Sequence, residues 1–331
     1  MGKWSTPRSG SLAYLPRGRA ASSIGRIRNW PEVREGPKLL AFAGYKAGLT
    51  LVYLMDKNPQ SPTYGRELAK SATVLDVSPM LVFCLRTYGK GDKGLRSLGE
   101  VWMKNPPKHL ERVLSVPKKT NADEVLGELE KELSTVKEVR VVLATQPIDG
   151  GIGKKKPELM EVKVGGGSAQ QQFEYAKGLL GKQVKVSDVF KEGQEVDAIA
   201  VTKGKGLQGP VRRWGISLLS HKARKGRRKP GNLGPWHPAH VMRTIPRLGQ
   251  LGYHQRTEYG KRLLKMGSDG KEVTPKGGFT HYGVVKGDYV VVEGSLPGAK
   301  KRLVKLRYSI RLSEEVKPQD KVSVIGMLQW K

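Results

Sequence analysis

The chain has 331 residues, and its 60 Lys and Arg outnumber its 30 Asp and Glu, which gives a formal net charge of +30. This length is enough for two ordinary domains. The one cysteine, Cys84, excludes an intrachain disulfide and fits a reducing cytosol, and its apolar neighbours predict core packing. No apolar run reaches the length of a membrane span and the first residues do not resemble a signal peptide, so we expect a cytoplasmic protein without membrane contact.

The first part of the chain, residues 1–38, is predicted to be a basic N-terminal arm. Its arginines are spread among Gly, Ser and Pro, and no hydrophobic period is visible. An extended, cationic segment of this kind is a candidate RNA contact. The arginines concerned are Arg8, Arg17, Arg19, Arg26 and Arg28.

Two helices are predicted in the middle of the chain. In residues 78–197, 20 cations face 17 acids, so this block is nearly neutral. One helix is expected after Asn121, with its apolar face running from Val125 to Val136, and the other between Ser168 and Gly181. Runs of β-branched and apolar residues predict strands at 39–43, 49–55, 72–77, 81–88, 139–145, 159–164, 195–201, 303–310 and 321–327.

Further along, Gly287 and Asp288 predict a two-residue hairpin turn within residues 282–292. The expected fold is mixed α/β: a small antiparallel β-barrel with an inserted α+β domain and long extended RNA-binding arms. Strand number alone does not separate a barrel from a sandwich. The predicted boundaries are 39–80, 182–202 and 277–331 for the barrel core, 81–181 for the insert, and 203–276 for an extended basic loop without regular elements.

The most informative stretch is residues 198–257, which contains no Asp or Glu but 13 Lys and Arg, nine Gly and five Pro. Such a stretch cannot bury itself, because no carboxylate offsets the repulsion between its cations. Nucleic acid is the cheapest source of dense negative charge in a cell. The segment is too rich in Gly and Pro for a basic amphipathic helix at a membrane surface. We therefore predict that it binds nucleic acid.

Motifs of catalytic or cofactor chemistry are weak by comparison. Gly89–Gly94 and Gly204–Gly209 both match Gly-x-Gly-x-x-Gly, but neither is followed by the helix and later acid that a dinucleotide site needs. His237 and His240 lack the Cys or acidic partners of a zinc site. A nuclease or modifying enzyme needs carboxylates for a metal or base, and the most basic segment has none. We predict no enzyme activity, no metal and no cofactor.

Trp236 lies in a Gly/Pro turn among cations, where it is suited to stack on an unpaired base. The alternative is a small hydrophobic cluster with Leu233, Val241 and Met242. The candidate RNA-binding residues of the basic loop are Lys203, Lys205, Arg212, Arg213, Trp214, His221, Lys222, Arg224, Lys225, Arg227, Arg228, Lys229, Trp236, His237, His240, Arg243, Arg247, Tyr253, His254 and Arg256.

Several of these segments resemble the universal ribosomal protein L-three family, archaeal type. Phe190, Asp197, Ala200, Thr202, Gly204 to Gly206, Gly209 and Arg213 follow the signature spacing of that family. The segments 236–242 and 249–254 resemble the tip and return of its rRNA-penetrating extension, and 45–50 resembles its first barrel strands. The helical block is similar to the insert of archaeal and eukaryotic members.

The resemblance implies a large-subunit ribosomal protein with a translation-factor-like barrel. It implies binding to the 3′-terminal domain of large-subunit rRNA early in assembly, next to other ribosomal proteins. It also implies a finger toward the peptidyl-transferase centre, with Trp236 near the tRNA path. Two departures stand out: Arg224 occupies the position of a modified His in eukaryotic members, and Lys331 ends the chain without their basic tail.

Two other functions remain open on the residues alone. One is an RNA-modifying or RNA-cleaving enzyme with a basic substrate arm, which needs a group of carboxylates or Cys/His ligands brought together by the fold. The other is a free RNA chaperone, which binds RNA without joining a fixed complex. Stoichiometric cosedimentation with large ribosomal subunits distinguishes the ribosomal reading from both.

Overall fold

A computed structural model describes residues 7–57, 60–117, 121–311 and 324–327. Its chain divides into two compact units. The basic unit comprises the described residues up to 23 together with 201–256, and the sheet unit comprises 24–200 and the described residues from 257 onward. The predicted strand at 321–327 is confirmed at 324–327, and residues 321–323 lie outside the described ones.

The sheet unit contains most of the regular structure. Its strands are β1 Lys38–Leu39, β2 Ala41–Met55, β3 Glu67–Asp76, β4 Met80–Gly91, β5 Gly94–Trp102, β6 Val136–Ala144, β7 Leu159–Gly165, β8 Gln183–Val184, β9 Glu195–Val201, β12 Gln255–Gly267, β13 Tyr289–Glu293, β14 Leu303–Tyr308 and β15 Val324–Met327. Its helices are η1 Lys108–Arg112, α1 Ala122–Lys131, η2 Leu133–Thr135, α2 Ala169–Leu179, η3 Val186–Asp188 and η5 Gly270–Glu272.

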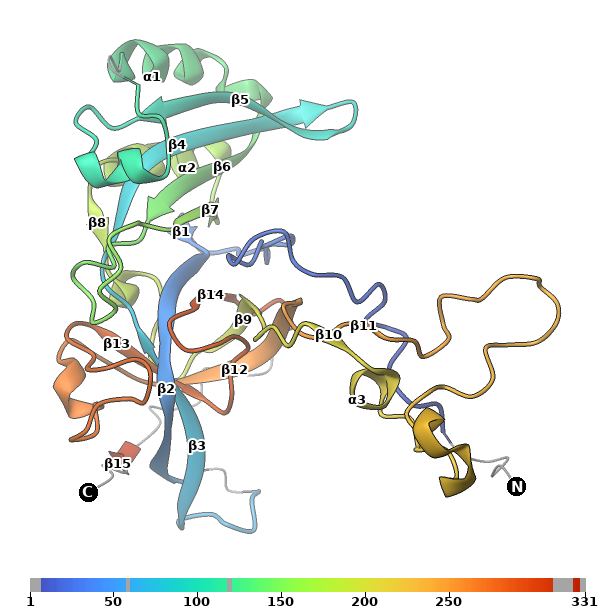
Figure 1. Ribbon diagram of the computed structural model, residues 1–331. Helices are drawn as coiled ribbons and strands as arrows, with labels where there is room; N and C mark the ends of the chain where they lie inside the picture. The colour runs from blue at the N-terminus through green and yellow to red at the C-terminus, as the bar shows by residue number, and fades with distance from the viewer. Residues whose placement is uncertain (1–6, 58–59, 118–120, 312–323, 328–331) are drawn as a thin grey trace. The chain divides into compact units, whose positions relative to one another are not determined.

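These strands pair into two antiparallel sheets within the described residues. One sheet has the order β1-β7-β6-β4-β5, with β8 beside β4. The other has the order β14-β9-β12-β13-β3-β2-β15, and β14 also pairs with β2. The expectation of a mixed α/β protein built mainly from antiparallel strands is confirmed (Figure 1).

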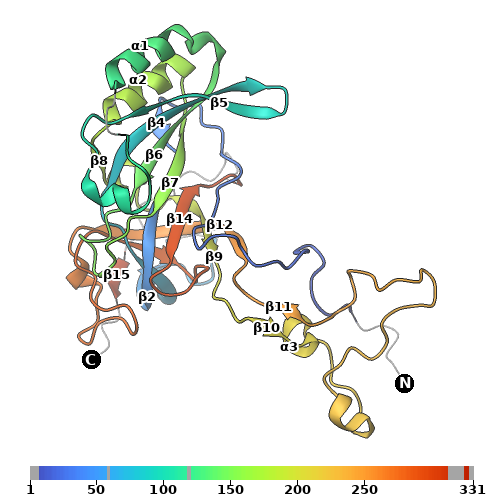
Figure 2. The ribbon, with the colours of Figure 1, turned by 45° about the horizontal axis from the view of Figure 1, so that its top comes forward.

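Both long helices cover the same side of the first sheet, where they lie next to each other (Figure 2). An ion pair of 2.7 Å between Lys177 of α2 and Glu130 of α1 joins them. Behind them a single apolar cluster continues from the first sheet into the second, and it includes Phe42, Leu85 and Phe173. Burial of these side chains therefore links the two sheets energetically.

The predicted helix starts differ in how they are capped. The Ser168 hydroxyl accepts a hydrogen bond from the Gln171 backbone amide, and the Gln171 side-chain oxygen accepts one from the Ser168 backbone amide. The predicted start of α2 is therefore a complete capping box. Asn121 precedes α1 but makes no side-chain cap; its amide nitrogen donates to Glu124 instead. The predicted apolar face is also too long, because α1 ends at Lys131 and Val136 is a buried residue of β6.

Three further strand predictions need correction. Residues 39–43 and 49–55 do not form separate strands, because β2 runs through Gly44 and Gly48; a β-carbon at Gly48 would lie 2.3 Å from the Phe279 ring, so that ring occupies the space of a side chain. Leu95–Trp102 is part of β5, a hairpin partner of β4 that was not among the predicted strands. The hairpin predicted at 282–292 is wrong: β13 pairs with β12 and β3.

The expectation that 203–276 lacks regular elements is also wrong. β12 spans 13 residues, of which Leu263 and Leu264 are buried. Its many charged residues hide the alternating apolar pattern by which a strand is predicted. In the basic unit the elements are β10 Leu207–Gln208, α3 Pro210–Trp214, η4 His221–Gly226 and β11 Gly249–Gln250, and β10 pairs with β11.

Candidate nucleic-acid interface

The two units differ in how their positive charges are balanced. Residues 1–23 and 201–256 contain four and thirteen Lys or Arg and no Asp or Glu, so no cation of the basic unit can pair with a carboxylate of its own. Every ion pair between described residues joins side chains of the sheet unit, as in Lys70–Glu293 at 2.7 Å and Arg307–Asp197 at 2.6 Å. The basic unit is thus the part of the chain whose cations have no carboxylate partner of their own.

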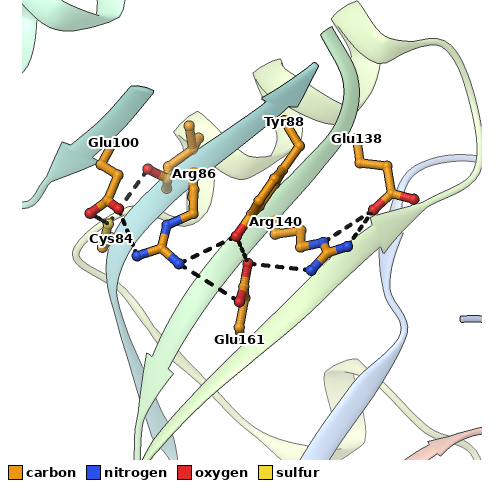
Figure 3. A network of polar contacts seen from close by, with 8 residues as sticks. Cys84, Arg86, Tyr88, Glu100, Glu138, Arg140 and Glu161 are labelled. Atoms are coloured by element: carbon orange, nitrogen blue, oxygen red, sulfur yellow. Dashed lines mark hydrogen bonds and ion pairs between the residues drawn. The ribbon is translucent and has the colours of Figure 1, made fainter. Parts of the chain in front are cut away.

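A network on the strands β4 to β7 illustrates this balance in the sheet unit (Figure 3). Arg86 pairs with Glu100 at 2.6 Å, and Arg140 pairs with Glu138 at 2.7 Å. Glu161 accepts a hydrogen bond from the Tyr88 hydroxyl at 2.5 Å. Burial raises the pKa of Glu138, but the hydrogen bonds from Arg140 and Lys163 outweigh it, so the net shift is downward. The cations of this network are therefore paired with carboxylates of the same unit.

The basic unit is instead organised around the indole of Trp214, which is 4% exposed. Pro210 opens α3 and Gly215, with φ of +72°, closes it directly after Trp214. The indole nitrogen donates to the Arg247 carbonyl at 2.9 Å. On one face the Arg17 guanidinium lies 3.9 Å from the ring centroid. This contact places the N-terminal arm on residues 201–256, which we call the extension. At Gly10 a β-carbon would lie 2.6 Å from the same ring.

Arg17 and Arg213 act as internal braces with their guanidinium groups. Arg17 donates to the Arg213 carbonyl at 2.5 Å, and Arg213 donates to the carbonyls of Gln250 at 2.9 Å and Arg247 at 3.2 Å. Burial lowers the pKa of Arg17, and the nearby charges of Arg213 and Arg256 lower it further. Cations held together without a carboxylate raise the local positive potential, which favours a polyanion.

The base of the extension is a short ribbon made by β10, β11 and the residues that flank them. Gly252 has φ of +73°, and a β-carbon there would lie 2.1 Å from the Lys203 carbonyl oxygen, so only glycine fits. The His254 ring is 7% exposed. Its Nε2 accepts from the Gly252 amide at 3.1 Å, so Nδ1 carries the proton and donates to the Gly18 carbonyl at 2.8 Å.

From this ribbon a long loop extends, drawn from yellow to orange in Figure 1. Trp236 in this loop is 88% exposed. Leu233, Val241 and Met242 are 45%, 43% and 40% exposed, so they do not bury the Trp236 ring in the hydrophobic cluster considered as its alternative. An indole held in water by Gly and Pro neighbours leaves both faces open to a stacking partner.

The candidate residues fall into three groups by exposure. Trp214 and His254 are buried, and their rings serve packing and backbone hydrogen bonds. Four are half-buried: Arg17, Arg213, Tyr253 and Arg256. The exposed ones are Arg8, Arg19, Arg26, Arg28, Lys203, Lys205, Arg212, His221, Lys222, Arg224, Lys225, Arg227, Arg228, Lys229, Trp236, His237, His240, Arg243 and Arg247, of which Arg26 and Arg28 belong to the sheet unit.

Sequence reasoning did not single out Tyr14, which is 56% exposed and has the Arg256 guanidinium 4.6 Å from its ring centroid. This pair forms a second aromatic platform beside the cations. The signal available was its position: Tyr14 lies in a segment without acids, between Arg8 and Arg17.

The structure also bears on the other motifs of the sequence. Gly89–Gly94 lies in the β4–β5 hairpin, and Gly204–Gly209 precedes the five-residue α3, so neither opens a dinucleotide-binding helix. Cys84 is a buried free thiol whose pKa burial raises to about 12, as expected for core packing. Within the described ranges no group of three or more His, Cys, Asp or Glu is placed to hold a metal, and no described helix has the length and apolarity of a membrane span.

Comparison with known proteins then decides the family. The family model described as ribosomal protein L3 matches residues 1–326. The chain belongs to the ribosomal protein L3 family. It is 49% identical to the large ribosomal subunit protein uL3 of Pyrobaculum arsenaticum over 98% of this chain and 97% of that one. It is 49% identical to that of Archaeoglobus fulgidus over 93% of each, and 48% identical to that of Methanococcus vannielii over 95% and 94%.

The L3 assignment agrees with the resemblance seen in the sequence, including its archaeal type. It identifies the chain as a member of a family of ribosomal proteins and not of enzymes. Two residues of the signature that carries this resemblance are buried in the core of the sheet unit. Phe190 is 1% exposed, with its ring centroid 5.3 Å from that of Tyr308, and Asp197 is fully buried against Arg307.

Proposed function

We propose that this chain is a structural constituent of the large ribosomal subunit in the cytoplasm. It binds the 3′-terminal domain of large-subunit rRNA, supports early subunit assembly and extends its basic loop toward the peptidyl-transferase centre. The observation that carries this proposal is the basic unit, whose seventeen cations have no carboxylate of their own. Folded RNA supplies the missing negative charge, and neighbouring ribosomal proteins complete the surroundings.

The binding mechanism follows from the arrangement of the cations. The arm and the extension are held together by Arg17, Arg213 and Trp214. The exposed cations are therefore presented to RNA in a fixed arrangement. Each neutralised phosphate releases counterions, and affinity therefore falls steeply with salt. The deep, narrow major groove of A-form RNA is closed to side chains, so contacts go to phosphates, sugars and unpaired bases. Trp236 stacks on such a base near the tRNA path.

We further propose that the second sheet closes into a small barrel similar to that of translation factors. The support is that β14 pairs with both β9 and β2, which joins the two ends of the order β9-β12-β13-β3-β2. On this proposal residues 39–80, 182–202 and 277–331 form the barrel core and 81–181 form an inserted α+β domain. The arms are residues 1–38 and the basic loop within 203–276.

Sucrose-gradient sedimentation tests the ribosomal role. Expressed in an archaeal host as the sole copy, the chain should cosediment with large subunits at constant stoichiometry. Deletion of residues 212–256 should block assembly, because the unit would lose most of its cations. Trp236→Ala should leave subunit yield unchanged and impair tRNA selection. Sedimentation only as free protein, or normal tRNA selection by the Trp236→Ala ribosomes, would contradict the ribosomal role or the fingertip role, respectively.

A further inference from the structure

A second group of basic residues lies in the sheet unit, between residues 108 and 155 and outside the acid-free segment. Side chains of η1 and of the loop between β6 and β7 line a shallow, open pocket of about 230 Å³. Roughly 300–1,000 Å³ is typical of sites for drug-sized ligands, so this pocket suits one small flat group. We name it the η1 pocket; its lining residues are Lys108, His109, Arg112, Ile148 and Lys155.

One wall of the η1 pocket is fixed to the core through Leu110, which is 0% exposed. Leu110 packs in a cluster with Phe83 and Trp102, whose ring centroids lie 5.3 Å apart. Its amide donates to the Pro107 carbonyl at 3.0 Å, and its own carbonyl accepts from the Leu114 amide at 3.0 Å. The charged residues on either side of Leu110 are therefore presented from a rigid turn.

The opposite wall is the loop 146–157, which is held at its base and its middle. The Thr145 amide donates to the Glu158 carbonyl at 3.0 Å, and the Glu158 amide donates to the Thr145 hydroxyl at 2.9 Å. In the middle, the Gly151 amide donates to Asp76 at 3.2 Å. Despite this anchoring, Ile148 remains 62% exposed. A fixed loop thus holds an apolar side chain open to solvent beside cations.

The charges around the η1 pocket are unmatched, unlike those nearby. Lys154 in the same loop pairs with Glu158 at 2.5 Å. Among the described residues, Lys108, Arg112 and Lys155 have no carboxylate within ion-pair distance.

We propose that the η1 pocket binds one unpaired RNA nucleotide. Apolar atoms form almost all of its wall, which suits the face of a base against Ile148. The three cations that line the pocket suit the adjacent phosphates. An acidic peptide would satisfy the cations but not the apolar wall. The choice of RNA as the partner rests on the proposed ribosomal function. The η1 pocket as a binding site, and one unpaired nucleotide as its ligand, go beyond that function.

Two matched triple variants of the full chain test the charge part. Both remove three cations of the sheet unit, so they have equal net charge. The control residues are exposed and form no ion pair with a described carboxylate. The pocket variant is Lys108→Gln, Arg112→Gln and Lys155→Gln, and the control is Lys93→Gln, Arg96→Gln and Lys137→Gln. In filter binding to transcribed large-subunit rRNA, the pocket variant should lose roughly tenfold in affinity, with a salt slope smaller by about one to two. The control should bind like the wild type.

Ultraviolet crosslinking of the wild-type complex, followed by mass spectrometry, tests the location. A nucleotide should be found on the peptide that contains His109 or Ile148, and Ile148→Ser should abolish that crosslink while crosslinks within 201–256 persist. Crosslinks within 201–256 alone, together with equal affinities of the two triple variants, would overturn the η1 pocket and leave the proposed function standing. Absence of any rRNA binding by the wild type would overturn both.

Discussion

The guanidinium of Arg307 lies 2.6 Å from the carboxylate of Asp197, and the two side chains are 4% and 0% exposed. The pair joins β14 to β9 across the second sheet. Both oxygen atoms of Asp197 accept backbone hydrogen bonds as well: Oδ1 accepts from the Gly260 amide at 3.1 Å, and Oδ2, which also contacts Arg307, accepts from the Ile310 amide at 3.2 Å. One buried carboxylate therefore organises three segments that are distant in sequence.

Arg307→Met should destabilise the sheet unit by about 3–5 kcal/mol, because it leaves the Asp197 charge buried without its partner. Urea unfolding followed by circular dichroism measures the change. The matched control is Lys70→Met, which breaks the more exposed Lys70–Glu293 pair and should cost less than about 1 kcal/mol. Equal costs for the two variants would show that burial of the Asp197 pair is unimportant.

Trp214→Ala should release the N-terminal arm from the extension, because Arg17 loses the ring on which it lies and Arg247 loses its indole donor. Large aromatic truncations in packed sites cost about 3–5 kcal/mol locally. Limited trypsin digestion should then cut at Arg17 and Arg19 much faster than in the wild type. Trp236→Ala, at an 88% exposed ring, is the control and should leave the digestion pattern unchanged. Unchanged digestion of Trp214→Ala would refute the positioning role.

Gly252→Ala should disrupt the ribbon at the base of the extension, since the new β-carbon would meet the Lys203 carbonyl at 2.1 Å. Gly206→Ala is the matched control: it also has positive φ, +65°, but open space around it, so it should cost only about 1 kcal/mol from backbone strain. Hydrogen exchange of the Lys205 amide, which donates to the Leu251 carbonyl at 2.9 Å, reports on the ribbon. Similar protection in both variants would contradict this prediction.

Lys305 should make stability depend on pH in the alkaline range. Its side chain is 6% exposed, and burial lowers its pKa from 10.5 to about 8. Because the folded-state pKa is the lower one, the cost of burying the charged form is complete below pH 8. This cost fades as pH rises from 8 toward the unfolded value of 10.5.

Lys305→Met removes this titration and should raise the free energy of unfolding at pH 7 by up to about 3 kcal/mol. The advantage over the wild type should shrink between pH 8 and 10.5. Urea unfolding at pH 7, 8, 9 and 10 measures it for both proteins. If the stability difference between the two proteins is constant across this range, folding does not lower the pKa of Lys305.

The sequence by itself determined the chemistry of this protein. The absence of acids from 198–257 is a property of composition, and no fold can supply a carboxylate that the segment lacks. The strand β9 and the helix start at Ser168 were also predictable, because a short, mainly apolar run and a local N-cap depend on neighbouring residues alone. The exposure of Trp236 followed from its Gly and Pro neighbours in the same way.

Only the tertiary structure decided which aromatic and cationic residues face solvent. Trp214 and Trp236 both lie among cations in sequence, yet one is buried and the other is 88% exposed, because Arg17 and the Arg247 carbonyl reach Trp214 from distant positions. Contacts between distant segments leave no local periodicity, which is why β12 and the buried role of His254 were missed. The η1 pocket likewise arises from two separate loops that sequence spacing does not connect.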